Sequence, residues 1–464
     1  MLHDLVLLGV CVLFSVLLLV IIGQKIGIAS PIFLVLSGLL VSLITGVPTI
    51  EIEPDLVFLI FLPPILFEAA WFTSWQDFHR WRKPILSMAF GLVFITSIVV
   101  GYLSTWLIPG FTLALGFLLG GVNSPPDAVA ATSVLKNIKV PRKINALLEG
   151  ESLINDASSL IVFKFALVAS ITGEFIWSEA VKDFFIMAIG GTIVGVVVGY
   201  FFSLVLKYLP TNSSIDTVMT LLIPYVMYIV AEHFEFSGVL AVVSGGLLMS
   251  YYSHWFLSHI SRIQSESVWK VLIFMMNTII FVLIGLELPI VVKGLSQYTI
   301  TEGIYYSIII GGAIVGTRLI YCYSLTYIPY FIKRSRGEHV ASPDWREPFI
   351  ISFAAMRGVV SLAAALAIPV FMPNGEAFPH RNIILLVTFV IILITLVGQG
   401  LLLKPILKIL NVKSDYEHER SREWQDLHLQ RRLKQLSLEY ITTKYSEDIE
   451  RNSFVNHQKV KIGK

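Results

Sequence analysis

Charged side chains are scarce in this sequence. Aspartate, glutamate, lysine and arginine make up 14% of the 464 residues, against roughly 25% in an ordinary soluble domain. Hydrophobic residues make up 55%. A protein with so few charges cannot cover its surface with groups that face water, which excludes a soluble enzyme or binding domain. The composition predicts an integral membrane protein with membrane lipid around it.

Cysteine is scarcer still, with Cys11 and Cys322 in separate apolar stretches. Neither belongs to a CxxC motif or a Cys/His cluster, so we expect two small buried hydrophobic side chains and no disulfide or metal framework. The sequence also lacks a phosphate-binding loop, a nucleophile elbow and a His-Glu metal motif. We therefore expect no enzyme activity, no cofactor and no nucleic-acid partner.

Long apolar stretches are abundant, and most approach or exceed the ~20 residues that cross a bilayer as a helix. The first could pass for a signal peptide, but it lacks a basic start and a small-residue cleavage site, so we interpret it as a retained span. The sequence predicts an all-α polytopic fold of about thirteen spans. Their expected limits are 5–22, 31–46, 55–72, 84–107, 111–135, 144–172, 180–206, 215–231, 237–252, 268–288, 302–330, 347–370 and 382–410.

Lysine and arginine are distributed unevenly between the two sets of loops. One set is rich in them near residues 80–83, 136–143 and 333–346, whereas the other carries only Lys182, Lys293 and Arg381. Because cytoplasmic loops hold the excess of basic residues, we expect the N-terminus outside and the C-terminus in the cytoplasm. Residues 1–410 form the expected membrane domain. Residues 411–464 form a short tail, expected to be a solvated extension or dimer brace rather than a ligand sensor.

Segment 111–135 is interrupted by Pro125 and Pro126, followed by Asp127. Two prolines remove two N–H donors, so the carbonyls of Gly121 and Val122 lose their helical partners. Such backbone is tolerated at membrane depth only inside protein or beside a wet cavity. We interpret the break as part of a cation site; the alternative is a plain kink with a capping aspartate.

Segment 144–172 begins with a cluster of acids and small polar residues, including Glu151, Ser152, Asn155 and Asp156. A charge at mid-bilayer costs at least ~2.5 kcal/mol, so it needs a reason. Ser152 and Asp156 share a helix face, and their oxygens are ligands that a small hard cation prefers. We predict that Asp156 holds either a proton or a cation. The alternative is a structural aspartate paired with Arg318 or Arg357.

Segment 347–370 carries Arg357-Gly358 among small residues, which suggests a second interruption. This segment lies seven segments after segment 111–135, which carries the first interruption. If the thirteen spans form an inverted repeat of six spans, a linker span and six spans, the two interrupted segments occupy equivalent positions in the two halves. That pattern points to a transporter site near the midplane. Two further charges stay open: Glu68 either lines the ion route or ties its segment to neighbours, and Lys164 either faces an acid in an outer funnel or forms a buried pair.

Four stretches together resemble the monovalent cation/proton antiporters of the sodium/proton exchanger branch, NhaP-like and NHE-like. They span residues 61–369 in the family's order and read FLPPILFEAAW, SPPDAVAA, LLEGESLINDAS and FAAMRGVVSLAAALAIP. The resemblance implies thirteen helices in two inverted six-helix repeats, with unwound helices crossing in a mobile core, and a homodimer in the bacterial cell membrane.

The resemblance also implies roles for individual residues. Asp156 matches the carboxylate that binds cation and proton, Asn155 stands beside it as in the electroneutral branch, and Ser152 and Glu68 match positions that help form the ion site. Glu151 looks like the acid paired with an arginine, here Arg318. One departure concerns the first break, which reads Pro126-Asp127-Ala128 where the family usually has Thr-Asp-Pro or Val-Asp-Pro, and it bears on ion selectivity.

These observations predict a secondary antiporter that exchanges Na+ or Li+ for H+, with K+/H+ exchange of the same fold as the alternative. A passive cation channel is a different class. It would need a continuous polar pore, but no ring of filter residues is apparent in the sequence.

Overall fold

A computed structural model of the chain describes residues 14–15, 17–18, 20–21, 30–42, 54–127, 135, 140–173, 177–209, 212–295, 298–338, 342–410 and 416–444. Within them the structure is helical, and its only β contacts are two isolated bridges. The chain divides into two units, Met1–Asn411 and Val412–Lys464. In the second unit, the structure describes α18 (Tyr416–Lys444), a helix rich in charge of both signs.

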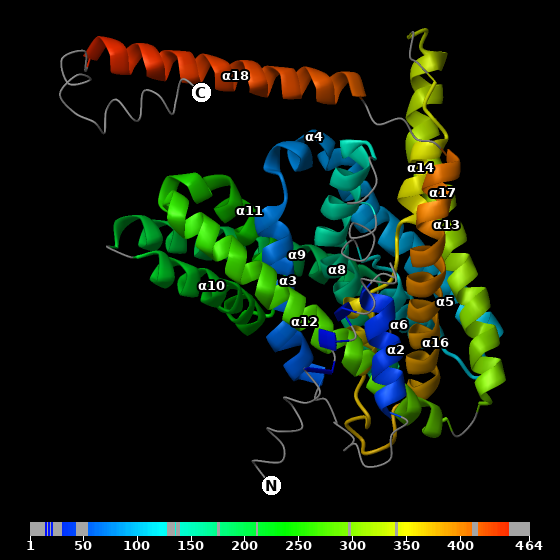
Figure 1. Cartoon of the computed structure of the whole chain (residues 1–464). Coiled ribbons are helices and arrows are strands. Elements are labelled where there is room, and N and C mark those ends of the chain that lie inside the picture. The colour runs from blue at the N-terminus through cyan, green and yellow to red at the C-terminus, as the bar shows by residue number, and fades with distance from the viewer. Residues whose placement is uncertain are drawn as a thin grey trace. The chain divides into compact units, whose positions relative to one another are not determined.

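The first unit contains the apolar helices (Figure 1). Their bounds are α2 Ser30–Ser42, α3 Pro54–Phe72, α4 Trp75–Leu86, the π-helical η1 Ser87–Leu92, α5 Val93–Leu107, α6 Leu113–Asn123, α8 Arg142–Thr172, α9 Trp177–Tyr208, α10 Ser213–His233, α11 Gly238–Phe256, α12 His259–Lys293, α13 Ile300–Ser335, α14 Arg346–Phe353, α15 Val359–Leu366, α16 Arg381–Leu393, the π-helical η2 Ile394–Gln399 and α17 Gly400–Leu410.

Seven continuous helical stretches in the described part are long and apolar enough to cross a membrane. The described parts of the predicted segments from 31–46 onward lie mostly in helices. Segment 5–22, and segment 111–135 beyond Asp127, lie largely outside the described residues. The number thirteen therefore stays a prediction. Helix starts follow local chemistry: Asn212 accepts a hydrogen bond from the Ile215 amide at 2.9 Å, and Thr299 forms a capping box with Glu302.

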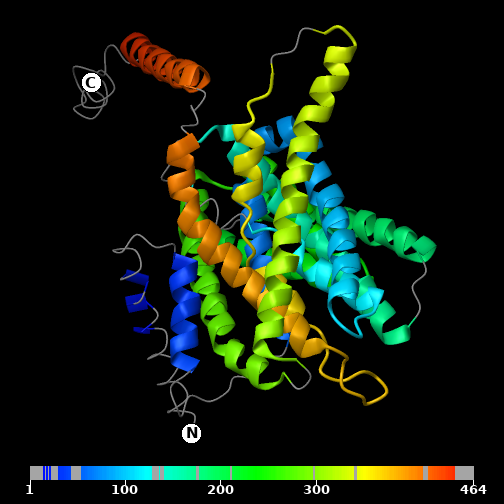
Figure 2. The same cartoon turned by 90° about the vertical axis from the view of Figure 1, so that its right-hand side faces the viewer.

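The helices pack in two groups that meet at α8, α3 and α12. One group joins α9, α10 and α11, and the other joins α5, α6, α13 and α16 (Figure 1). Figure 2 shows α16, η2 and α17 running in series, with α16 beside α13. In the first group, Gly191, Gly195 and Gly199 of α9 face small residues of α11, which lets the two backbones approach closely. Small residues at an interface are the usual way to pack helices in lipid, where no hydrophobic force drives association.

Candidate functional site

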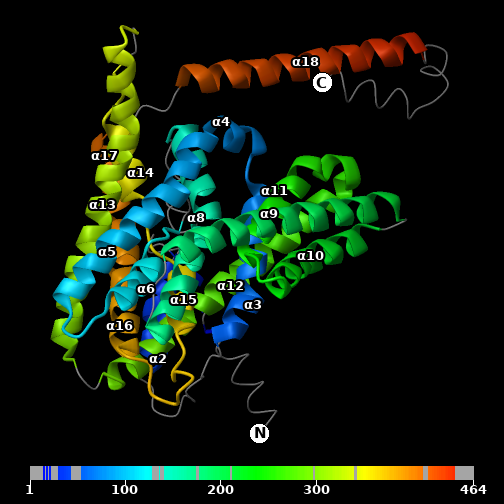
Figure 3. The ribbon, with the colours of Figure 1, turned by 180° about the vertical axis from the view of Figure 1, so that it is seen from behind.

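Two broken helices cross beside α8. Helix α6 ends at Asn123, and the chain continues without helical structure to Asp127; α14 ends at Phe353, and α15 starts at Val359. The amide of Asp127 donates to the Met356 carbonyl at 2.6 Å, and these two residues form an antiparallel bridge. Figure 3 shows α6 and α8 next to α15. The interruptions expected from Pro125-Pro126 and Arg357-Gly358 thus contact each other.

Gly358 allows this close crossing. A β-carbon on Gly358 would overlap the carboxylate of Asp127, so any larger residue would push the two breaks apart. The Asp127 carboxylate consequently lies against the start of α15, of which Gly358 is the N-cap. A negative charge is favourable at a helix N-terminus. The geometry therefore suits a fixed negative charge at Asp127.

Side chains donate hydrogen bonds to several of the backbone carbonyls at the first break. The Ser124 hydroxyl donates to Gly121 O at 3.2 Å, the Asn155 amide donates to Pro126 O at 3.2 Å, and Arg357 Nε donates to Asn123 O at 3.3 Å. The Gly121 carbonyl lacks its helical amide donor, as the two prolines predict, but it is not free: the buried hydroxyl of Ser124, one turn away, replaces that donor.

Asn155 and Asp156 approach the crossing from α8. Asn155 is fully buried, and Asp156 is 7% exposed. Asp127 is close enough to interact electrostatically with Asp156. Across the described residues, no side chain donates a hydrogen bond to the Asp156 carboxylate, and no ion pair includes it. Ser152 lies one turn earlier on the same helix and is half-buried.

Two further oxygens near the crossing are buried without a hydrogen-bond donor in the described part of the chain. They are Oδ1 of Asn123 and Oδ1 of Asn155. Both amide nitrogens are occupied: Asn123 donates to Thr388 Oγ1 at 2.9 Å and Asn155 donates to Pro126 O. Leaving buried oxygens without donors is costly. Amide and carboxylate oxygens are ligands that a small hard cation prefers.

Arg357 lies at the centre of the crossing and is 2% exposed. Besides its contact with Asn123 O, its Nη1 donates to Ala355 O at 3.3 Å, and its backbone amide donates to Thr395 Oγ1 at 3.2 Å. Its positive charge thereby compensates the carbonyl dipoles of both breaks. Thr388 and Thr395 are not among the site residues expected from the sequence. What could have pointed to them is that each is a polar residue inside the strongly apolar segment 382–410.

Glu151 and Arg318 form a bidentate ion pair in the interior, with N–O distances of 2.5 and 2.6 Å. Arg318 Nη2 also lies 3.4 Å from the carbonyl oxygen of Ile351 on α14. Both side chains are almost completely buried. The pair links α8, α13 and α14, which hold the two broken helices.

The remaining predicted charges lie elsewhere in the fold. Glu68 is half-buried on α3, whose neighbouring residues Phe67 and Ala70 pack near Gly246 of α11. Lys164 pairs with Glu232 of α10 at 2.9 Å, and both side chains are partly exposed, so this is not a buried pair. In the described part, no cluster of three or more histidine, cysteine or acidic residues could hold a metal.

Comparisons with known proteins agree with this arrangement. The family described as Sodium/hydrogen exchanger, transmembrane, matches residues 12–409. The chain is 31% identical to a sodium, potassium, lithium and rubidium/H(+) antiporter of Bacillus pumilus over 91% of its length and 63% of that protein. The protein of the same description in Bacillus subtilis is 34% identical over 82% of this chain and 58% of the relative. The chain thus spans about three fifths of these two relatives.

The fold matches a solved transporter structure. The sodium proton antiporter MjNhaP1 of Methanocaldococcus jannaschii aligns with a TM-score of 0.67 at 18% identity, covering 86% of this chain and 99% of that one. At this identity the likeness concerns the fold alone, which in the described residues is helical, with two interruptions that contact each other at Asp127 and Met356. Because the family match covers residues 12–409, the chain belongs to the sodium/hydrogen exchanger family, a family of transporters and not of enzymes.

Proposed function

We propose that the protein is a secondary antiporter that exchanges Na+ or Li+ for H+ across the bacterial cytoplasmic membrane. The observation that carries this proposal is the buried carboxylate of Asp156 beside two crossed helix breaks. Hydrogen bonds and an ion pair satisfy the buried charges of Glu151, Arg318 and Arg357. Among the described residues, none donates a hydrogen bond to the Asp156 carboxylate. A carboxylate in this setting can bind a proton or a cation, but not both at once.

The exchange follows from that competition. With a proton on Asp156, that carboxyl is neutral and no longer attracts a cation. When the proton leaves, Asp156 and the amide oxygens of Asn123 and Asn155 offer oxygen ligands to a cation. Ser152 lies one turn away and is assigned to the same site, and Glu68 either lines the route or ties α3 to its neighbours.

Asp127 and Arg357 are proposed to stay charged throughout the cycle. Asp127 lies at the start of α15, and Arg357 contacts carbonyl groups of both breaks. The charges of Asp127 and Arg357 are opposite in sign, and both stay at the crossing throughout the proposed cycle. A cycle in which only Asp156 changes its proton would then exchange one proton for one monovalent cation, without net charge movement.

K+/H+ exchange is the second candidate. The two Bacillus relatives are described as antiporters of sodium, potassium, lithium and rubidium. The break in this chain also lacks the threonine that the family often places there. Both observations favour a broader ion range than Na+ and Li+ alone.

The remaining assignments are proposals of the same kind. We assign the chain to a homodimer in the cell membrane, with residues 1–410 as the transport domain. The tail 411–464 is assigned to the cytoplasm on the distribution of lysine and arginine between loops.

The test is proton movement in everted membrane vesicles, followed by a pH-sensitive dye as Na+, Li+, K+ and Rb+ are added in turn. We expect dequenching with Na+ and Li+, and its extension to K+ and Rb+ would support the second candidate. Vesicles that contain the Asp156→Asn variant set the background. A cation response no larger than this background, at equal protein amounts, would overturn the proposal.

A further inference from the structure

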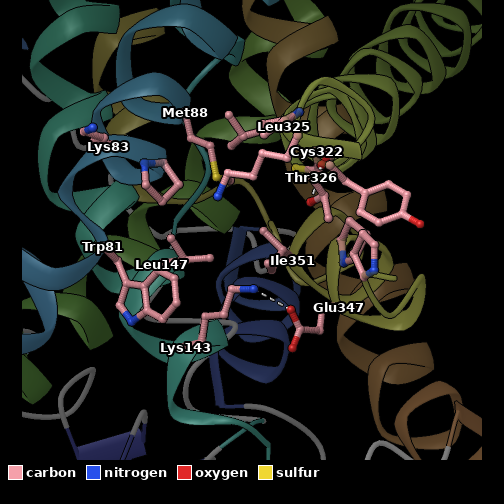
Figure 4. A pocket seen from close by; sticks show the side chains of 16 residues that line it. Trp81, Lys83, Met88, Lys143, Leu147, Cys322, Leu325, Thr326, Glu347 and Ile351 are labelled. Carbon is pink, nitrogen blue, oxygen red and sulfur yellow. Dashed lines mark hydrogen bonds and ion pairs between the residues drawn. The ribbon is translucent and has the colours of Figure 1, made fainter. Parts of the chain in front are cut away.

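A cavity of about 530 Å³ opens between α4, η1, α8, α13 and α14 (Figure 4). Its lining does not include Asp127, Asn155 or Asp156, so it is separate from the crossing described above. The volume falls within the roughly 300–1,000 Å³ typical of small-molecule sites. The function proposed above gives this cavity no role.

The charges around the cavity are mostly positive. Lys83, Lys143 and Lys333 line it, together with one acid, Glu347. Lys143 and Glu347 neutralise each other at 2.6 Å, as the dashed line in Figure 4 marks. Lys83 and Lys333 are exposed, and neither forms an ion pair with another described residue. Two positive charges are therefore available to an anion.

The wall of the cavity is largely apolar. Met88, Leu147, Leu325 and Ile351 contribute to it, and Trp81 adds an aromatic ring that lies 5.3 Å from the Lys143 ammonium. A free inorganic anion gains nothing from such a wall. A molecule with an anionic head and an apolar body uses both the lysines and the hydrophobic surface.

We propose that this cavity binds the headgroup of an anionic phospholipid. Lys83 and Lys333 contact its phosphate, and the glycerol region and the first methylenes of the acyl chains lie on the apolar wall. The three basic loops that surround the cavity are those expected in the cytoplasm. Anionic lipids are plentiful in that leaflet, and basic pockets between transmembrane helices are suited to bind their headgroups.

Binding here would stabilise the interior of the protein. Leu147 lies one turn before Glu151 on α8, and Cys322 lies one turn after Arg318 on α13. Ile351, whose carbonyl oxygen lies near Arg318 Nη2, belongs to the same wall. A lipid in the cavity therefore packs next to the ion pair and α14, and should raise the unfolding temperature.

The experiment uses the full chain purified in a neutral detergent and measures the midpoint of thermal unfolding. Phosphatidylglycerol is titrated, with phosphatidylcholine as the neutral lipid and inorganic phosphate as the soluble anion. We expect only phosphatidylglycerol to raise the midpoint. In the Lys83→Gln/Lys333→Gln variant, the half-saturating concentration should rise about tenfold or more, because each basic residue near an anionic lipid contributes measurably to binding.

The matched control is Arg336→Gln/Lys408→Gln. It removes the same charge from two exposed residues that do not line the cavity, and it should change the half-saturating concentration less than about twofold. Equal effects of the two variants would mean general attraction of anionic lipid to a basic surface. An equal response to inorganic phosphate, or none to phosphatidylglycerol, would also overturn the proposal. The readout does not involve transport, so it is independent of the proposed exchange activity.

Discussion

Glu151 and Asp156 lie on the same helix, α8, and both are almost completely buried, at 0% and 7% exposure. Their surroundings differ. Glu151 accepts two hydrogen bonds from Arg318, so a positive charge in direct contact neutralises its negative charge. Asp156 faces a second carboxylate, Asp127, beside two helix breaks. Burial alone therefore does not identify a functional acid; what matters is whether the fold provides a partner for the charge.

From this comparison we propose that Glu151 contributes to stability and that Asp156 carries the exchange. A buried acid with a fixed arginine gains little from binding a proton or cation, because its negative charge is already neutralised. A buried acid without such a donor must find its counter-charge in the ion or proton that arrives. The predictions below test this division.

Asp156→Asn should have the largest effect, a fall of cation-dependent proton movement to the background of empty vesicles. Asparagine keeps the shape of the side chain but cannot exchange a proton for a cation. Membrane insertion and the unfolding midpoint should stay close to those of the unmodified protein. Asp216→Asn is the matched control, since Asp216 is a buried aspartate on α10 whose carboxylate accepts from Ser261. Robust Na+-dependent proton movement in Asp156→Asn would sink the mechanism.

Glu151→Gln and Arg318→Gln should instead lower stability. Removing one partner of a buried pair costs about 3–5 kcal/mol, because the remaining charge is stranded. The double replacement should recover part of that loss in denaturant or thermal unfolding of the detergent-solubilised protein. If Glu151 couples with Arg357 and not with Arg318 in a double-mutant cycle, the assignment of the pair is wrong although the exchange proposal survives.

Part of the loss of folding stability in acid should come from the N-terminal end of α16. His380 precedes that helix with a φ of 56°, and its Nδ1 lies 2.7 Å from the Tyr298 hydroxyl. Burial lowers the pKa of His380 below its ordinary 6.5. The folded state thus favours the neutral ring, and this stabilisation is full above pH 6.5 and is lost as the pH falls through the lowered pKa.

The measurement compares unfolding midpoints between pH 7.5 and 5 for the unmodified protein and for His380→Asn. Asparagine tolerates a positive φ and does not titrate. We expect a slightly smaller acid-induced drop in His380→Asn. Equal drops would place the acid sensitivity in groups other than His380.

Imposed voltage should have the smallest effect, close to none. If one carboxylate exchanges one proton for one monovalent cation, no net charge crosses the membrane in a cycle. The test is turnover in liposomes whose potential is clamped with K+ and valinomycin. A rate that changes markedly with voltage would mean that a second charge, for instance Asp127, takes part in the cycle.

Much of the fold could be predicted from the sequence because lipid imposes simple rules. A helix must be apolar and about twenty residues long, so the limits of segments such as 144–172 and 215–231 lie within two residues of α8 and α10. Prolines and an Arg-Gly pair in apolar segments marked both breaks, because each disrupts helical hydrogen bonding or helix packing. Asp156, Glu151 and Arg318 could also be picked out from the sequence, because a charge in an apolar membrane segment is costly and therefore needs a structural or functional reason.

Only the tertiary structure decided which groups meet. The sequence left Arg318 and Arg357 as rival partners of the buried acids, since both lie in apolar segments. In the fold, Arg318 reaches Glu151, while Arg357 contacts the carbonyls of Asn123 and Ala355. The bridge between Asp127 and Met356, and the Ser124 hydroxyl on Gly121 O, likewise join atoms whose proximity depends on how helices cross. Local chemistry sets where a helix forms or breaks, but partner choice depends on distances between distant segments, which hydropathy and spacing do not encode.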